Sequence, residues 1–79
     1  MNKPLENEIK VGSVYVHKHG LRYRVDSVSV MDVTGYEDGK EPRAYVLYTQ
    51  LEAGTYPAGQ QWVREANDFV VYFTSEDKA

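Results

Sequence analysis

The stretch AYVLYTQLEAGTYPAGQQWVR, residues 44–64, determines the fold predicted for this chain. It begins with a run typical of a β-strand, passes through a loop with glycine and proline, and ends in a short strand that carries the only tryptophan. The longer strand, residues 43–51, is apolar on both faces, which indicates a central or doubly covered position. Which of its faces meets the core is left open. The second strand is predicted over residues 60–64.

Two further strands precede this stretch and are predicted to form a tight hairpin. Residues 13–18 alternate between polar and apolar faces, and the same alternation resumes over residues 21–30. Between them, Lys18-His19-Gly20 has the length and the glycine of a three-residue hairpin loop. At Ser27 the apolar register shifts by one residue, which indicates a β-bulge or sharp bend.

The remaining segments complete a five-stranded prediction. Residues 32–42 are acidic and rich in turn residues, so they are predicted to be a long exposed loop. Residues 65–68 are predicted to form one helical turn, and residues 69–73 (FVVYF) the last strand. The fold class is therefore all-β, a small five-stranded, SH3-like, partly open barrel with one short helical turn before the last strand. Residues 1–10 are expected to be a flexible segment, 11–73 a single domain and 74–79 a charged tail.

Composition narrows the classes of function. A chain of 79 residues without cysteine is one small domain that cannot use disulfides or thiolate zinc sites, and a monomer or a small homo-oligomer fits this size. No signal peptide and no membrane span is recognisable, so we expect a cytoplasmic protein without a membrane partner. The net charge is −3, yet residues 9–25 contain four basic residues and no acid. A local basic face therefore stays open.

Three separate pieces of the chain resemble the DUF1653 family of uncharacterised bacterial and phage domains. They are Gly12-Ser-Val-Tyr15 with His17-Lys18-His19-Gly20 and Tyr23-Arg24-Val25, then Val46-Leu-Tyr48-Thr-Gln-Leu51, and finally Trp62-Val63-Arg64 with Phe69. The chain departs from the family pattern at Glu65, where a proline is usual, and in a longer acidic loop. The resemblance implies an SH3-like β domain of no established activity, and suggests a phage origin.

The first candidate site is the histidine pair of the hairpin. His17 and His19 lie two residues apart on one side of a strand, a spacing that permits two metal ligands. A metal site needs three or four ligands, and neither cysteine nor a nearby carboxylate supplies the rest. Solvated histidines, or a pH-sensitive contact, are the simpler interpretation. No metal and no cofactor is therefore predicted.

The second candidate is the short strand that contains Trp62 and Arg64. If Val63 points inward, the two side chains share an exposed face with the composition of a binding hot spot. The alternative is that Trp62 packs in the core, since tryptophan is highly buried on average. The seven tyrosines are too many for one small core, and Tyr23 and Tyr45 are the most core-like by register. Other tyrosines, Tyr48 among them, would either extend the binding face or stabilise the sheet by cross-strand pairing.

Three functions follow from these residues. The first is a non-enzymatic module that binds a protein or peptide through an aromatic–basic surface made of His17, Lys18, His19, Arg22, Tyr48, Trp62 and Arg64. The alternative is nucleic-acid or nucleotide binding by the basic hairpin and exposed aromatics. The third is an enzyme acting through a histidine of the hairpin, which requires a concave pocket beside a titratable group with a perturbed pKa. No catalytic residues are predicted, because no nucleophile elbow, phosphate loop or paired-carboxylate motif is present.

Overall fold

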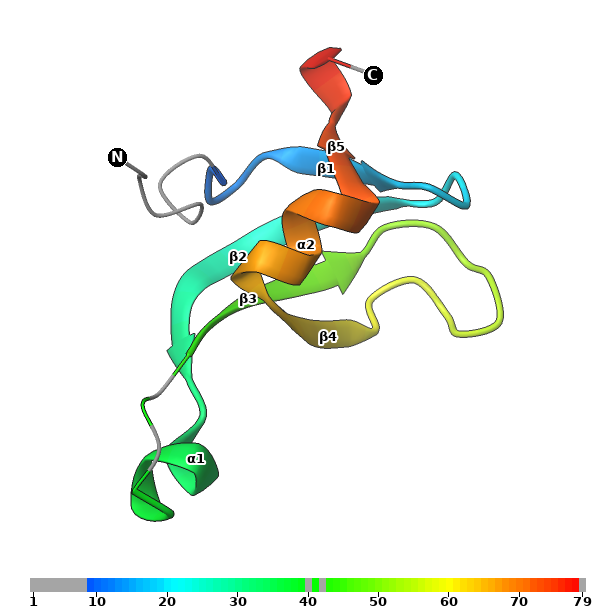
Figure 1. Cartoon of the computed structure of the whole chain (residues 1–79). Helices are drawn as coiled ribbons and strands as arrows, with labels where there is room; N and C mark the ends of the chain where they lie inside the picture. Colours follow the sequence, from blue (N-terminus) through cyan, green and yellow to red (C-terminus); the bar gives the residue numbers. More distant parts are fainter. Residues whose placement is uncertain (1–8, 40, 42, 79) are drawn as a thin grey trace.

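The computed structural model describes residues 9–39, 41 and 43–78. These residues form five antiparallel strands in one sheet, with two short α-helices and a terminal 3₁₀ turn. The strands are β1 (Val14–His17), β2 (Arg22–Met31), β3 (Ala44–Gln50), β4 (Gln61–Glu65) and β5 (Phe73–Ser75), and the 3₁₀ turn is η2 (Glu76–Lys78). The order across the sheet is β4-β3-β2-β1-β5, and the sheet is not closed (Figure 1). The predicted class, mostly β with five strands, is confirmed.

The predicted hairpin and bulge are both present. His17 N–H donates to Leu21 O, and Gly20, with φ of 107°, donates back to His17 O, so three residues make the turn. The β2–β3 register shifts between Val25 and Ser27. The extra residue there bends β2. The first half of β2 pairs with β1, and β3 pairs along the whole length of β2.

The last strand was predicted in the wrong place. Residues 69–72 belong to a helix, α2 (Ala66–Tyr72), and the strand begins only at Phe73. Glu65 caps the helix, since its carboxylate accepts from the backbone N–H groups of Asn67 and Asp68. The helix lies in front of the sheet, over its concave side (Figure 1). Buried Ala66 and Phe69, with partly buried Val70, lie at the i, i+3, i+4 spacing of one helix face, and buried Phe73 follows as the first residue of β5.

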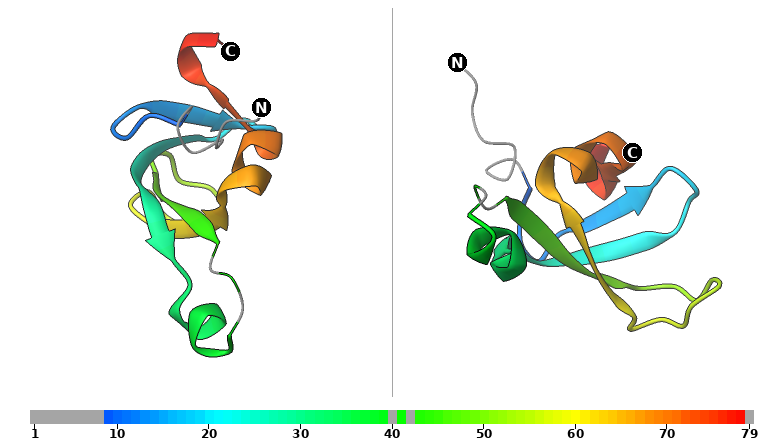
Figure 2. Two further views of the ribbon diagram at one scale, coloured as in Figure 1. Left: turned by 60° about the vertical axis from the view of Figure 1, so that its left-hand side comes forward. Right: turned by 60° about the horizontal axis from the view of Figure 1, so that its bottom comes forward.

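The acidic segment was predicted as a loop without regular structure, and it contains one short helix, α1 (Val33–Glu37). Asp32 caps it by accepting from Thr34 N–H, 3.0 Å away. None of its residues is buried, so the predicted exposure is correct. Figure 2 shows α1 standing apart from the sheet and α2. Lys40 and Pro42, which belong to the same predicted loop, lie outside the described residues.

The core lies between the concave side of the sheet and α2. Its centre is a cluster of aromatic rings in edge-to-face or stacked contact, contributed by Tyr15, Tyr23, Tyr48, Phe69 and Phe73. Tyr23 is buried as predicted, whereas Tyr45 is only partly buried. On β3 the core face is the one with Val46, Tyr48 and Gln50. This answers the question left open for the strand predicted over residues 43–51, namely which of its faces meets the core.

The chain ends contribute to this core and sheet. Ile9 is buried and belongs to the core cluster. Residues 73–75 pair with β1 as an edge strand. Of the predicted flexible segment, residues 1–8 lie outside the described residues. Within the part of the chain that is described, no helix has the length and apolar character needed to cross a bilayer.

Candidate functional site

Strand alternation on β4 decides which side chains face the concave side. Val63 is 55% exposed and points to the outer face, so the condition for an exposed Trp62–Arg64 face, an inward Val63, is not met. Trp62 and Arg64 do share a face, as predicted, but it is the concave face, and both are half-buried. Trp62 is opposite Tyr48 on β3, and Arg64 is opposite Val46. Both side chains therefore lie over the aromatic core.

The concave face carries two neighbouring pockets, which we call the Arg64 pocket and the Tyr56 pocket. The Arg64 pocket, about 180 Å³, is lined by His17, His19, Tyr23, Tyr48, Trp62, Arg64 and Phe73. The Tyr56 pocket, about 310 Å³, is lined by His19, Leu21, Tyr23, Gln50, Thr55, Tyr56 and Trp62. Three residues, His19, Tyr23 and Trp62, line both, so the pockets adjoin, and we call the two together the groove. No carboxylate lines either of them.

Five of the seven predicted site residues line the Arg64 pocket: His17, His19, Tyr48, Trp62 and Arg64. Lys18 lies beside it, with its ammonium 5.3 Å from the centre of the Tyr72 ring. Arg22 is not in the groove, because on β2 it alternates with Tyr23 and so points to the outer face. There it forms ion pairs with Glu52 at 3.4 Å and Glu76 at 3.1 Å.

The hairpin holds its two histidines in a fixed stack. Their ring centres are 3.8 Å apart, and each Nδ1 accepts a backbone N–H, from His19 to His17 and from Leu21 to His19. The proton of each neutral ring is therefore assigned to Nε2, which can act as a donor. Burial lowers the pKa of His17, and the nearby His19, Arg64 and Lys18 lower it further. At neutral pH the ring of His17 is an uncharged donor.

Arg64 is the one cationic group among the residues that line the groove. Its Nη1 donates to Asp68 at 2.8 Å, and its guanidinium carbon lies 4.8 Å from the centre of the Tyr72 ring. Burial by itself would lower the pKa of Arg64, but the side chains of Tyr48 and Asp68 raise it above its ordinary value. Its Nε is buried and has no hydrogen-bond partner among the described residues. The guanidinium is thus charged, positioned and incompletely satisfied.

Gln50 positions Trp62, a role that the sequence analysis missed. The indole Nε1–H donates to Gln50 Oε1 at 3.1 Å, and the Gln50 amide donates to the backbone carbonyls of Glu52 and Tyr56. Tyr56 then meets the indole edge-to-face, with ring centres 5.0 Å apart. A glutamine inside an apolar strand was the available signal, because a buried amide needs partners.

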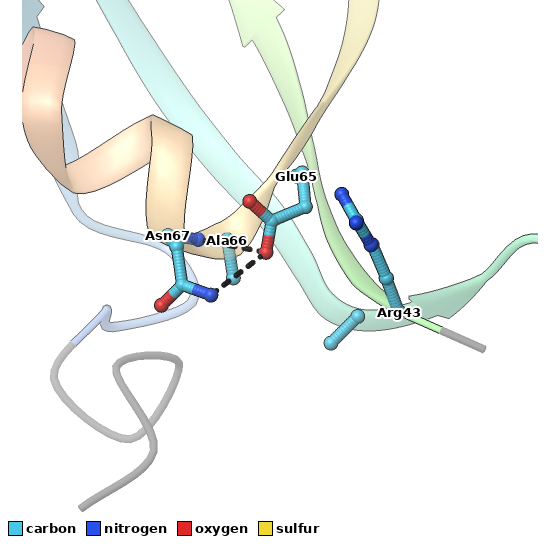
Figure 3. A pocket seen from close by; sticks show the side chains of 5 residues that line it. Arg43, Glu65, Ala66 and Asn67 are labelled. Carbon is cyan, nitrogen blue, oxygen red and sulfur yellow. Dashed lines mark hydrogen bonds between the residues drawn. The ribbon is translucent and has the colours of Figure 1, made fainter. Parts of the chain in front are cut away.

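A third pocket lies at the start of α2 and has a structural explanation. It is lined by Arg43, Ala44, Glu65, Ala66 and Asn67. Figure 3 shows the Glu65 carboxylate accepting from both the backbone and the side chain of Asn67. These contacts cap α2. The carboxylate of Glu65 and the amide of Asn67 in this pocket are therefore engaged in holding the helix.

The chain matches no family model, no curated protein and no solved structure among those compared. The argument for function therefore depends on the groove. Among the described residues, no group of three or more histidine, aspartate or glutamate side chains could hold a metal ion. What the groove offers is aromatic surface, neutral N–H and O–H donors, and one guanidinium.

Proposed function

We propose that this protein is a binding module that recognises a peptide or an exposed protein segment in the groove formed by the Arg64 and Tyr56 pockets. The single observation that carries the proposal is that the two pockets adjoin, with His19, Tyr23 and Trp62 in the lining of both. Two adjoining pockets with aromatic walls and fixed donors suit an extended chain, which presents both apolar side chains and backbone carbonyls. The fixed indole of Trp62 adds contact area at small entropic cost.

Nucleic-acid binding is the weaker candidate. The prediction of nucleic-acid binding depended on the basic residues of the first hairpin. Three of these residues do not face the groove as free charges. Arg22 is paired with Glu52 and Glu76, and Arg24 with Asp26, all on the outer face. Lys18 contacts Tyr72 at the margin of the groove. Binding a phosphate backbone requires several unneutralised cations along one surface, so this arrangement favours a peptide.

Catalysis is also supported less well than peptide binding, although the pocket and the perturbed histidine that it requires are present. His17 lines a concave pocket, and its pKa is lowered. A histidine base needs a nucleophile or a partner carboxylate within reach. The lining of the Arg64 pocket includes no serine, threonine, cysteine, aspartate or glutamate. This set of residues supports binding better than catalysis.

The fold and family belong to the same proposal. The order β4-β3-β2-β1-β5, a long bent β2 shared by both hairpins, and a short helix before β5 all support an SH3-like arrangement. Membership of the DUF1653 family, a phage origin and a cytoplasmic location are proposed with it. The family and the phage origin rest on the three sequence pieces described above, and the location rests on the features of the whole sequence given with the composition.

Selection from a random peptide library tests the function. The wild-type protein is expected to enrich a peptide motif, and Tyr56→Ala should lose that enrichment because it removes one wall of the groove. Val63→Ala, on the outer face of β4, is the matched control and should keep it. Enrichment that survives Tyr56→Ala and Trp62→Ala, in proteins shown to be folded, would place binding elsewhere.

A further inference from the structure

We propose that the Arg64 pocket is a carboxylate-binding subsite, so that the recognised segment carries an acidic side chain beside an apolar one. This inference rests on the proposed function and names the chemistry of its ligand. The acidic side chain would lie in the Arg64 pocket, and the apolar one in the Tyr56 pocket.

Charge is the first argument. The Arg64 pocket is lined by one guanidinium and by no carboxylate. The compensating acid, Asp68, binds Nη1 from α2 and does not line the pocket. A cation of this kind, near neutral aromatic rings, attracts an anion or a carbonyl and repels an ammonium group. The aromatic walls therefore do not act as a cage for a cationic ligand.

Hydrogen-bond donors are the second argument. Both histidines are held with Nδ1 as acceptor toward the backbone, which leaves Nε2–H as a donor on each ring. With this tautomer His19 Nε2–H points at the hydroxyl oxygen of Tyr23, 3.4 Å away, so the donors left for a ligand are His17 Nε2–H and the Tyr23 O–H. A carboxylate has two oxygens that accept several such bonds. The donors and the guanidinium line the same pocket.

The unsatisfied Nε of Arg64 is the third argument, because it carries a free-energy cost. Its Nε is buried without a partner among the described residues, and its side chain is only 30% exposed. A buried donor without a partner is destabilising, so a placement chosen for stability alone would satisfy it. Ligand binding gives this guanidinium a reason to lie over Tyr72 and Phe73.

The geometry of an extended chain links the two pockets. Alternate residues of an extended peptide point to the same side, about 7 Å apart. The Tyr56 pocket offers Leu21, Tyr56 and Trp62 as apolar surface. An acidic residue and an apolar residue two positions apart would therefore reach adjacent pockets.

The test uses the full chain and three probes. The first two are blocked tripeptides of leucine, alanine and glutamate, and of leucine, alanine and glutamine, each made in both directions. The third is inorganic phosphate. Binding is followed by NMR at the indole N–H of Trp62 and the ring signals of His17. The glutamate peptide should bind about tenfold tighter than the glutamine peptide, as expected for one charge-assisted hydrogen bond.

Variants assign this preference to Arg64. Arg64→Met should abolish the preference, so that the two tripeptides bind equally. Arg64→Lys should keep part of the preference, because lysine keeps the charge but cannot form a bidentate contact. Arg24→Met, on the outer face, should leave it unchanged. If Arg64→Met does not fold, Arg64→Lys and Arg24→Met still decide the question.

Several outcomes overturn the proposal. Equal binding of the two tripeptides, or a preference that persists in Arg64→Met, contradicts it. Phosphate binding tighter than either peptide also contradicts it and supports the nucleotide alternative. The library selection separates this inference from the proposed function. A library that enriches motifs without acidic residues contradicts the carboxylate subsite and leaves the proposed function in place. A library that enriches nothing, while the glutamate peptide still binds, removes the function and keeps the carboxylate subsite.

Discussion

The indole of Trp62 donates a hydrogen bond from Nε1 to the side-chain carbonyl of Gln50, 3.1 Å away, across the β3–β4 pair. Gln50 is 3% exposed and also donates to the backbone of the β3–β4 loop at Glu52 and Tyr56. One buried amide therefore fixes the ring that joins the two pockets and the loop that carries Tyr56. The shape of the groove depends on this amide.

Replacing Gln50 should destabilise the fold and loosen the groove. Gln50→Ala removes three hydrogen bonds that are partly buried, so we expect a loss of about 2–4 kcal/mol in the free energy of unfolding. Urea unfolding measures this loss, and the emission of Trp62 should move to longer wavelength. Gln60→Ala is the matched control, because that amide makes one exposed hydrogen bond. A loss as small as that of the control would mean that Gln50 does not hold the loop.

Truncating Phe69 should be the most damaging change on α2. Its ring is 0% exposed and stacks on Phe73 with centres 4.1 Å apart. We expect Phe69→Ala to cost about 3–5 kcal/mol, which is enough to unfold much of a small domain. Val71→Ala, on the same helix but 55% exposed, should change the free energy by less than about 0.5 kcal/mol. If residues 69–73 formed a strand instead, positions 69 and 71 would share a face and the two variants would behave alike.

Asp26 should contribute stability that is lost in acid. Burial opposes its ionisation, but hydrogen bonds from Thr49 and Arg24 lower its pKa below the ordinary value of 3.8. Because the folded-state pKa lies below the unfolded one, this contribution is complete above pH 3.8 and disappears as pH falls through the folded-state pKa. The difference in the free energy of unfolding between wild type and Asp26→Asn, measured by urea unfolding, should become smaller as the pH falls through this acid range. Asp38→Asn, which removes an exposed carboxylate, is the matched control.

His17 should make the protein less stable in mild acid. Its ring is partly buried, lies near the charges of Arg64 and Lys18, and packs near Tyr23, Tyr72 and Phe73. Its folded-state pKa is lowered from 6.5, so the unfolded chain binds the proton more readily. Stability is therefore full above pH 6.5 and declines as pH falls toward the folded-state pKa. His17→Asn should weaken this decline, while His19→Asn, which keeps the His17 ring, should retain its direction. An unchanged decline in His17→Asn would assign the effect to other groups.

Local alternation predicted most of the sheet. The first hairpin, the bulge after Val25 and the central position of β3 follow from side-chain period and from one glycine in the turn. The helix α2 was missed because FVVYF has strong strand propensity. The apolar spacing of Ala66, Phe69, Val70 and Phe73 and the cap at Glu65 oppose that propensity, and burial against the sheet decides the outcome.

The grouping of the candidate site residues could be predicted from the sequence only in part. His17, His19, Tyr48, Trp62 and Arg64 were chosen by residue type, and the concave face brings them together. Arg22 was included because it is near His19 in sequence, although alternation on β2 places it on the outer face. The inward direction of Trp62 and Arg64 depends on how β4 pairs with β3. Pairing between distant strands has no local signal.

The measurement that tests the central claim most directly is an NMR titration of the folded protein with a peptide enriched from the library. We expect the largest shift changes at the Trp62 indole and at His17, Tyr48 and Tyr56, with little change at Val63 and Arg24 on the outer face. Changes confined to the outer face, or none at Trp62 under saturating peptide, would contradict a binding site in the groove.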